Sequence, residues 1–136
     1  MSHTFRIAAC FGLFAALTAQ ARPQQFDLRC EGTLQEALDG DIKPHTWSVR
    51  IDLANNQWCW NSCERTFSIA DVKPERIELV NEREDGRFRG LHTVTVDRRT
   101  GQFEQVSIQS RPVAWCRKVA GTCQPATFSG FPATRF

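Results

Sequence analysis

The sequence predicts an all-β domain. We expect a small antiparallel meander of seven to eight short strands, shaped as a closed barrel or a two-sheet sandwich and stapled by disulfides. Three observations favour this class: apolar residues alternate with polar ones along most of the chain, turn residues separate these segments, and several cysteines follow a predicted export signal. Short strands joined by short turns suit either architecture.

Residues 1–21 are predicted to be a secretory signal peptide. Arg6 supplies the positive charge, residues 7–19 form an uncharged apolar run, and residues 19–21 have the small-x-small cleavage pattern. This run is shorter than the about 20 residues that cross a bilayer, so we expect cleavage after Ala21 and no membrane span in the mature protein. The expected location is therefore secreted or periplasmic.

Residues 22–136 are predicted to form a single β-rich domain. Once Arg6 is removed, 16 Lys and Arg face 15 Asp and Glu, a formal net charge of +1 with both signs interspersed. This balance does not favour nucleic acid as a partner. We expect a monomer.

Period-two alternation marks the first strands, at residues 26–30 and most clearly at residues 47–53. Asn55 and Asn56 tolerate the left-handed backbone of a tight hairpin, so residues 57–60 are expected to form the return strand.

Further strands are expected at residues 77–79, 87–96 and 102–110, followed by a last strand that begins near Val113. Within the 102–110 segment, Phe103 and Val106 are out of phase, which predicts a bulge near Glu104 or Gln105. The glycine-containing segment 118–122 is predicted to be a turn.

Five cysteines remain after Cys10 leaves with the signal: Cys30, Cys59, Cys63, Cys116 and Cys123. In an oxidising compartment they allow two disulfides and one free thiol. Closeness in sequence favours Cys59–Cys63. Cys30 has the inward phase of Phe26 and Leu28, and it can meet Cys123 if the first and last strands are neighbours. Cys116 is then the candidate free thiol, whereas a Cys116–Cys123 bridge with a free Cys30 is the alternative.

The segment WCWNSC, residues 58–63, also suggests a thiol enzyme. Disulfide oxidoreductases place C-x-x-C at a helix N-terminus, but here three residues separate the cysteines and the flanking pattern is that of a strand. A structural zinc site needs four Cys or His ligands, usually in two close pairs, and only Cys59 and Cys63 form such a pair. A structural disulfide is therefore favoured, and no metal or cofactor is predicted.

The common catalytic motifs are missing, so no catalytic residue is predicted and an enzyme is the less favoured interpretation. His92 shares the phase of Val94 and Val96, which favours a hydrogen-bonded core or rim histidine over a general base.

The candidate ligand-binding residues are two tryptophans and two arginines. Trp58 and Trp60 share one face of their strand, where core packing is favoured over a ligand pocket. Arg87 and Arg89 flank Phe88 and offer an anion-binding patch, although an ordinary solvated hairpin is favoured there.

The leading functional hypothesis is a secreted or periplasmic non-catalytic binding module for a protein, a glycan or a small apolar ligand. The alternatives are a structural envelope protein that assembles through its spare cysteine or aromatic tail, and a thiol-disulfide enzyme that uses Cys59 and Cys63. In layout the chain is similar to small periplasmic β-barrel proteins such as inhibitors of C-type lysozyme. That likeness covers size, export signal, strand count and cysteine content; the serine-rich loop and C-terminal Tyr-x-Cys of those inhibitors are absent, so no inhibitory residue is carried over.

Overall fold

The computed structural model describes residues 23–84, 89–111 and 114–133. The predicted signal peptide and Arg87 lie outside these ranges. The described residues form nine strands and no helix: β1 (Gln25–Gln35), β2 (Ile42–Asp52), β3 (Gln57–Trp60), β4 (Phe67–Ser68), β5 (Asp71–Val72), β6 (Arg76–Glu84), β7 (Arg89–Asp97), β8 (Gln102–Arg111) and β9 (Trp115–Ala126).

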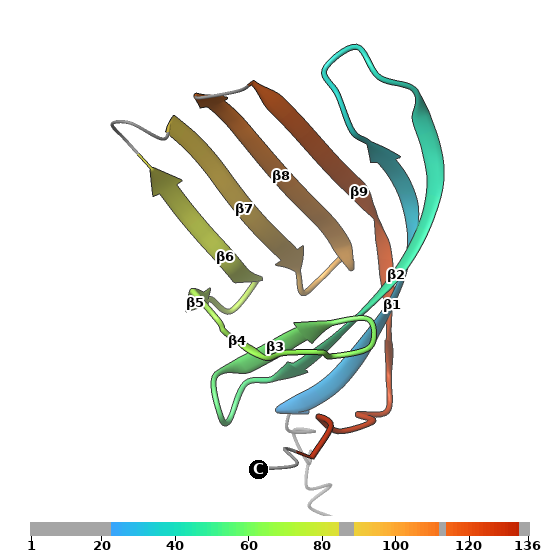
Figure 1. Ribbon diagram of the computed structural model, residues 1–136. Helices are drawn as coiled ribbons and strands as arrows, with labels where there is room; N and C mark the ends of the chain where they lie inside the picture. The colour runs from blue at the N-terminus through green and yellow to red at the C-terminus, as the bar shows by residue number, and fades with distance from the viewer. Residues whose placement is uncertain (1–22, 85–88, 112–113, 134–136) are drawn as a thin grey trace, which may run out of the picture.

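All nine strands form one antiparallel sheet in the order β4-β3-β2-β1-β9-β8-β7-β6-β5. Two meanders, β1–β4 and β5–β9, therefore join where the first strand pairs with the last. Figure 1 shows this sheet curled into a half-barrel, with β3, β4 and β5 crossing its lower end. The predicted all-β, disulfide-stapled antiparallel meander is confirmed, and its form is a single curled sheet.

The two outer edges of the sheet meet at that lower end, because only Ile69 and Ala70 separate β4 from β5. The Ile69 N–H donates to the Asn56 carbonyl at 3.3 Å, on the β3 side, whereas the Ala70 N–H donates to the Glu78 carbonyl of β6 at 2.9 Å. Adjacent residues thus tie opposite edges together. Because β4 and β5 are only two residues long, this connection is short and the half-barrel stays open above it.

The unpaired upper edges carry residues that discourage further strand pairing. Among the described strands, β3 covers only Val49–Asp52 of β2, so Lys43 and Pro44 lie on a free edge. On the opposite side, the exposed Glu82, Arg83 and Glu84 end β6 beyond its short pairing with β5. Proline and charged side chains are common protection for edge strands.

The pairing of β1 with β9 closes the chain on itself. Cys30 lies opposite Cys123, with a Cα–Cα distance of 4.0 Å, and the two form a disulfide. Two residues further on, Gly32 lies opposite Gly121. A Cβ added to Gly32 would overlap the Ala120 carbonyl oxygen, so this close approach of two backbones requires glycine.

The structure corrects two expectations about the second half of the chain. Residues 118–122 belong to β9 and form no turn, because Gly121 serves the close approach to β1. The β8 strand has no bulge near Glu104 or Gln105, since Phe103 faces the core and Val106 faces outward in an unbroken register. The register shifts lie instead between Glu78 and Val80 and between Arg89 and Gly90.

The hydrophobic core fills the lower part of the concave face. Its aromatic centre is Phe103, whose ring centroid lies 5.1 Å from that of Trp47 and 5.7 Å from that of Trp60. The buried members of this core are Leu28, Cys30, Trp47, Val49, Ile51, Trp58, Ile69, Ile77, Leu79, Val94, Val96, Phe103, Val119 and Cys123.

The β2–β3 hairpin confirms the asparagine turn. Asn56 has a φ of 55°, in the left-handed region that asparagine tolerates. The buried Asp52 carboxylate accepts hydrogen bonds from the Asn55 amide at 2.7 Å and from Gln25 at 2.8 Å. Burial raises the pKa of Asp52, but these hydrogen bonds outweigh it and hold the pKa below its ordinary value.

We predict that Gly32→Ala lowers the free energy of unfolding by roughly 1–3 kcal/mol, because the new methyl group overlaps the β9 backbone. Urea denaturation of the oxidised protein measures this change. Thr122→Ala, an exposed substitution on the facing strand, is the control and should change stability by less than about 0.5 kcal/mol. Equal stability of the two variants would contradict the assigned role of Gly32.

We also predict that the two disulfides differ in their contribution to stability. Their cysteines are separated by 93 and 4 residues, so the loop-closure model gives about 4–5 kcal/mol for Cys30–Cys123 and about 2 kcal/mol for Cys59–Cys63. Urea denaturation of the paired alanine variants Cys30→Ala/Cys123→Ala and Cys59→Ala/Cys63→Ala tests this order. A larger loss for the second pair would refute it.

Candidate binding site on the concave face

The inward face of β6–β9 changes from apolar to polar along the strands. Val94 and Val119 point into the core, and because side chains alternate along a strand, His92 and Arg117 point to the same concave side. The register completes a row across four strands: Glu82 lies opposite His92, His92 opposite Ser107, and Ser107 opposite Arg117. This row lies above the packed core.

A cavity of about 420 Å³ opens over this row. Besides Glu82, His92, Ser107 and Arg117, its lining includes Gln105, Gln109 and Trp115. Ligand pockets for small molecules begin at roughly 300 Å³, so the cavity is large enough for one. Its lining combines charged and polar side chains with apolar surface, whereas the core below it is apolar.

Two nitrogen atoms of this lining, His92 Nε2 and Arg117 Nε, are buried without a hydrogen-bond partner among the described residues. Arg117 is half-buried, and no acidic side chain among the described residues forms an ion pair with it. Nearly all buried polar atoms in folded proteins are paired with protein or water, because an unpaired one costs free energy. The cavity therefore presents the N–H donor of Arg117 Nε together with a second unpartnered nitrogen, His92 Nε2.

By contrast, the buried carboxylate of Glu78 has its hydrogen-bonding capacity filled by neighbouring side chains. Glu78 accepts hydrogen bonds from Lys73 at 2.9 Å, Arg76 at 2.6 Å and Asn81 at 3.1 Å. The hydrogen bond from Lys73 is the largest of the effects that hold the pKa of Glu78 below its ordinary value. Among these charged groups, only Arg117, at the cavity, has a buried nitrogen without a hydrogen-bond partner in the described part of the chain.

The acidic end of the row lies on β6 and the basic end on β9. Glu82 Oε2 is 3.8 Å from His92 Nδ1, and the Glu82 side chain is 73% exposed. This contact is long and open to solvent, so it neutralises little of the charge further along the row. An anion is therefore favoured at the Arg117 side and disfavoured at the Glu82 side.

Trp115 stands at the mouth of the cavity. It is 47% exposed, yet its indole N–H donates to Gln109 Oε1 at 2.6 Å, which fixes the edge of the ring. Gln109 and Trp115 lie opposite each other at the adjoining ends of β8 and β9. The fixed ring therefore presents apolar surface beside the polar row.

Glu82, His92 and Ser107 are also the residue types of an acid–base–nucleophile triad. Such chemistry needs a hydrogen bond from the nucleophile to the base. Here Ser107 Oγ accepts a hydrogen bond from Gln105 Nε2 at 3.4 Å, and His92 Nε2 has no partner. The expectation of a hydrogen-bonded His92 is therefore wrong for Nε2, and the arrangement suits binding better than nucleophilic attack.

The predicted ligand-binding residues that the structure describes do not line this cavity. Trp58 is buried in the core, and Trp60 is half-buried and packs against it, so both take the packing role that the sequence favoured. Arg89 is exposed, and its phase in β7 is opposite to that of His92, which places it on the convex side. Arg87 lies outside the described residues. The concave site thus draws on none of the three that the structure describes.

Sequence reasoning missed Ser107, Trp115 and Arg117. A signal was present, because Trp115, Arg117 and Val119 alternate in phase with Cys123. The turn expected at residues 118–122 broke that phase and hid the shared face. Ser107 had no comparable signal, since its neighbours across the sheet come from other strands.

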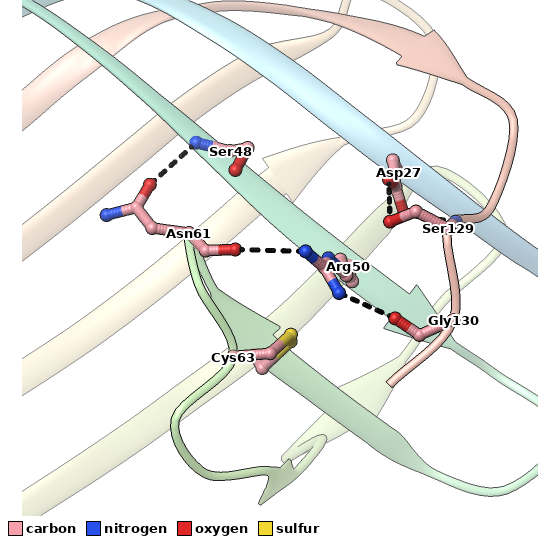
Figure 2. Close-up of a disulfide and its surroundings, with 8 residues drawn as sticks. Asp27, Ser48, Arg50, Asn61, Cys63, Ser129 and Gly130 are labelled. Atoms are coloured by element: carbon pink, nitrogen blue, oxygen red, sulfur yellow. Dashed lines mark hydrogen bonds between the residues drawn. A yellow bond between two sulfur atoms is a disulfide. The ribbon is translucent and has the colours of Figure 1, made fainter. Parts of the chain in front are cut away.

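Cys59 alternates with the core-facing Trp58 and Trp60, so the second disulfide, Cys59–Cys63, lies on the convex side of the sheet. Figure 2 shows its surroundings. Arg50 donates hydrogen bonds to the Gly130 carbonyl at 2.7 Å and to the Asn61 carbonyl at 3.5 Å, so one side chain connects the disulfide loop with the C-terminal segment. The Ser129 hydroxyl donates to Asp27 at 2.6 Å and holds the same segment on β1.

The cysteines of this disulfide are almost inaccessible: Cys59 is 0% exposed and Cys63 is 4% exposed. Reactive cysteines are usually solvent-accessible, so this burial argues against thiol–disulfide exchange. The two disulfides are the pairs that the sequence favoured, and Cys116 is the free, half-buried cysteine. It lies opposite Ile108 with the phase of the convex side.

Neither a metal centre nor a spanning helix is found in the described part of the chain. No group of three or more His, Cys, Asp or Glu there is placed to hold a metal ion, and no helix there has the length and apolar character needed to cross a bilayer. Comparisons with protein-family models, curated proteins and solved structures gave no significant match. The site must therefore be interpreted from its own geometry.

We predict that Arg117→Met raises the free energy of unfolding by about 1 kcal/mol, because it removes an unpaired, half-buried charge while keeping most of the side-chain volume. Urea denaturation without added ligand measures the gain. Lys118→Met, on the next residue and the opposite face, is the control and should be nearly neutral. A destabilised Arg117→Met protein would show that Arg117 has a structural role.

Proposed function

We propose that this protein is a non-catalytic binding module that holds a small anionic ligand in the concave cavity of its half-barrel. One observation carries the proposal: the half-buried Arg117 has no ion-pair partner among the described residues, and its Nε is buried at the cavity without an acceptor. Natural proteins keep such costly unpaired groups mainly at functional sites.

The residues around Arg117 support an anion as the ligand. A guanidinium presents several N–H donors in a planar fork that matches a carboxylate or phosphate. His92 Nε2 and the Ser107 hydroxyl lie on the next two strands of the same row and add polar groups toward the same space. An apolar ligand would bury these groups without compensating for their lost hydration.

Export from the cytoplasm belongs to the same proposal. The sequence of residues 1–21 has the organisation of a secretory signal. The two disulfides are compatible with an oxidising compartment, where such bonds persist. The proposed module thus acts in the periplasm or outside the cell.

We predict that acetate, used as the smallest carboxylate probe, binds in this cavity at millimolar concentrations. Titration followed by ¹H–¹⁵N NMR should shift the amide signals of β7, β8 and β9 around the polar row. Arg117→Gln should weaken this binding at least about tenfold, since a charge-assisted hydrogen bond contributes roughly 1.5–3 kcal/mol.

Lys118→Gln is the matched control, because it removes a positive charge from the adjacent residue on the convex face. Its acetate affinity should equal that of the unmodified protein. The proposal is wrong if acetate causes no shifts at the row, or if the arginine and lysine variants lose affinity equally.

A further inference from the structure

We infer that the ligand of this cavity is an acidic sugar, whose ring stacks on Trp115 while its carboxylate pairs with Arg117. This inference rests on the proposed function and specifies its ligand. It uses the one feature of the cavity that an anion alone leaves unexplained, namely the exposed and fixed indole of Trp115.

Trp115 has the properties of a stacking platform. Its indole N–H donates the 2.6 Å hydrogen bond to Gln109, and the residue remains 47% exposed at the cavity. A pyranose ring has an apolar face of C–H groups that packs against such a ring, with its hydroxyls left at the rim. The pre-fixed indole loses little conformational entropy when a ligand stacks on it.

The spacing along β9 suits one sugar unit. Trp115 and Arg117 are two residues apart on the same face of a strand, which places them roughly 6–7 Å apart. A hexuronate carries its carboxylate next to the ring, so ring and carboxylate reach neighbouring positions of this kind. Gln105, Ser107 and His92 lie on the adjacent strands and offer hydrogen-bonding groups to the ring hydroxyls.

The charges of the cavity orient such a ligand. Glu82 and Glu84 line the β6 side, whereas Arg117 lies on the β9 side. A carboxylate is repelled by Glu82 and Glu84 and attracted by Arg117, so the acidic group of the sugar is directed toward β9. A neutral sugar would leave Arg117 unpaired, and a simple carboxylate would leave the Trp115 ring uncovered.

The test compares three probes: methyl β-D-glucuronide, methyl β-D-glucoside and acetate. We expect the glucuronide to bind about tenfold more tightly than either of the others, because only it engages both Trp115 and Arg117. Trp115→Ala should reduce glucuronide affinity to the level of acetate and leave acetate affinity unchanged. Isothermal titration calorimetry measures the affinities, and a glucuronide-induced shift of the Trp115 indole N–H signal in the unmodified protein reports stacking.

Val106→Ala is the control variant, since Val106 faces outward from neighbouring β8 and does not line the cavity. It should bind all three probes like the unmodified protein. If acetate binds through Arg117 but the glucuronide binds no more tightly, the sugar inference is overturned while the proposed function stands. If the glucoside matches the glucuronide, the requirement for an acidic sugar is overturned. If no carboxylate probe binds, both proposals fall.

Discussion

The pairing of β1 with β9 is the interaction on which the rest of this structure depends. It joins two meanders that would otherwise be separate small sheets, and it brings together segments from the two ends of the domain. The Cys30–Cys123 disulfide locks the register, and Gly32 and Gly121 allow the two backbones to approach closely. Because the sheet curls around the paired strands β1 and β9, β2 and β7–β9 share one concave face, where Trp47 packs against Phe103.

The connection between β4 and β5, on the other side of the half-barrel, explains why the concave face has an apolar lower half and a more polar upper half. The short connection at Ile69 and Ala70 ties the sheet edges only at the lower end, where apolar residues fill the interior. Above it the edges diverge, and water or a ligand reaches the inner face. Inward residues there need not be apolar, so His92, Ser107 and Arg117 are tolerated. Arg117 Nε has no hydrogen-bond partner among the described residues, a cost that the proposed anion would offset.

Sequence patterns predicted much of the local structure and little of the site. Alternation placed Trp47, Val49 and Ile51 on one face, and Asn56 formed the expected turn. The prediction failed at Gly121, because glycine commonly marks a turn and here permits a close approach within a strand. That single error concealed the continuity of β9, and with it the common face of Trp115 and Arg117.

The sequence by itself determined which residues share a face, because side-chain direction in a strand follows from position alone. It also favoured one pairing of the cysteines, since the phase of Cys30 and the closeness of Cys59 to Cys63 pointed to the observed disulfides. Only the tertiary structure decided which face became concave and which strands became neighbours. His92, Ser107 and Arg117 come from three different strands, and their row exists because the register between strands is set by long-range pairing, which no local pattern encodes.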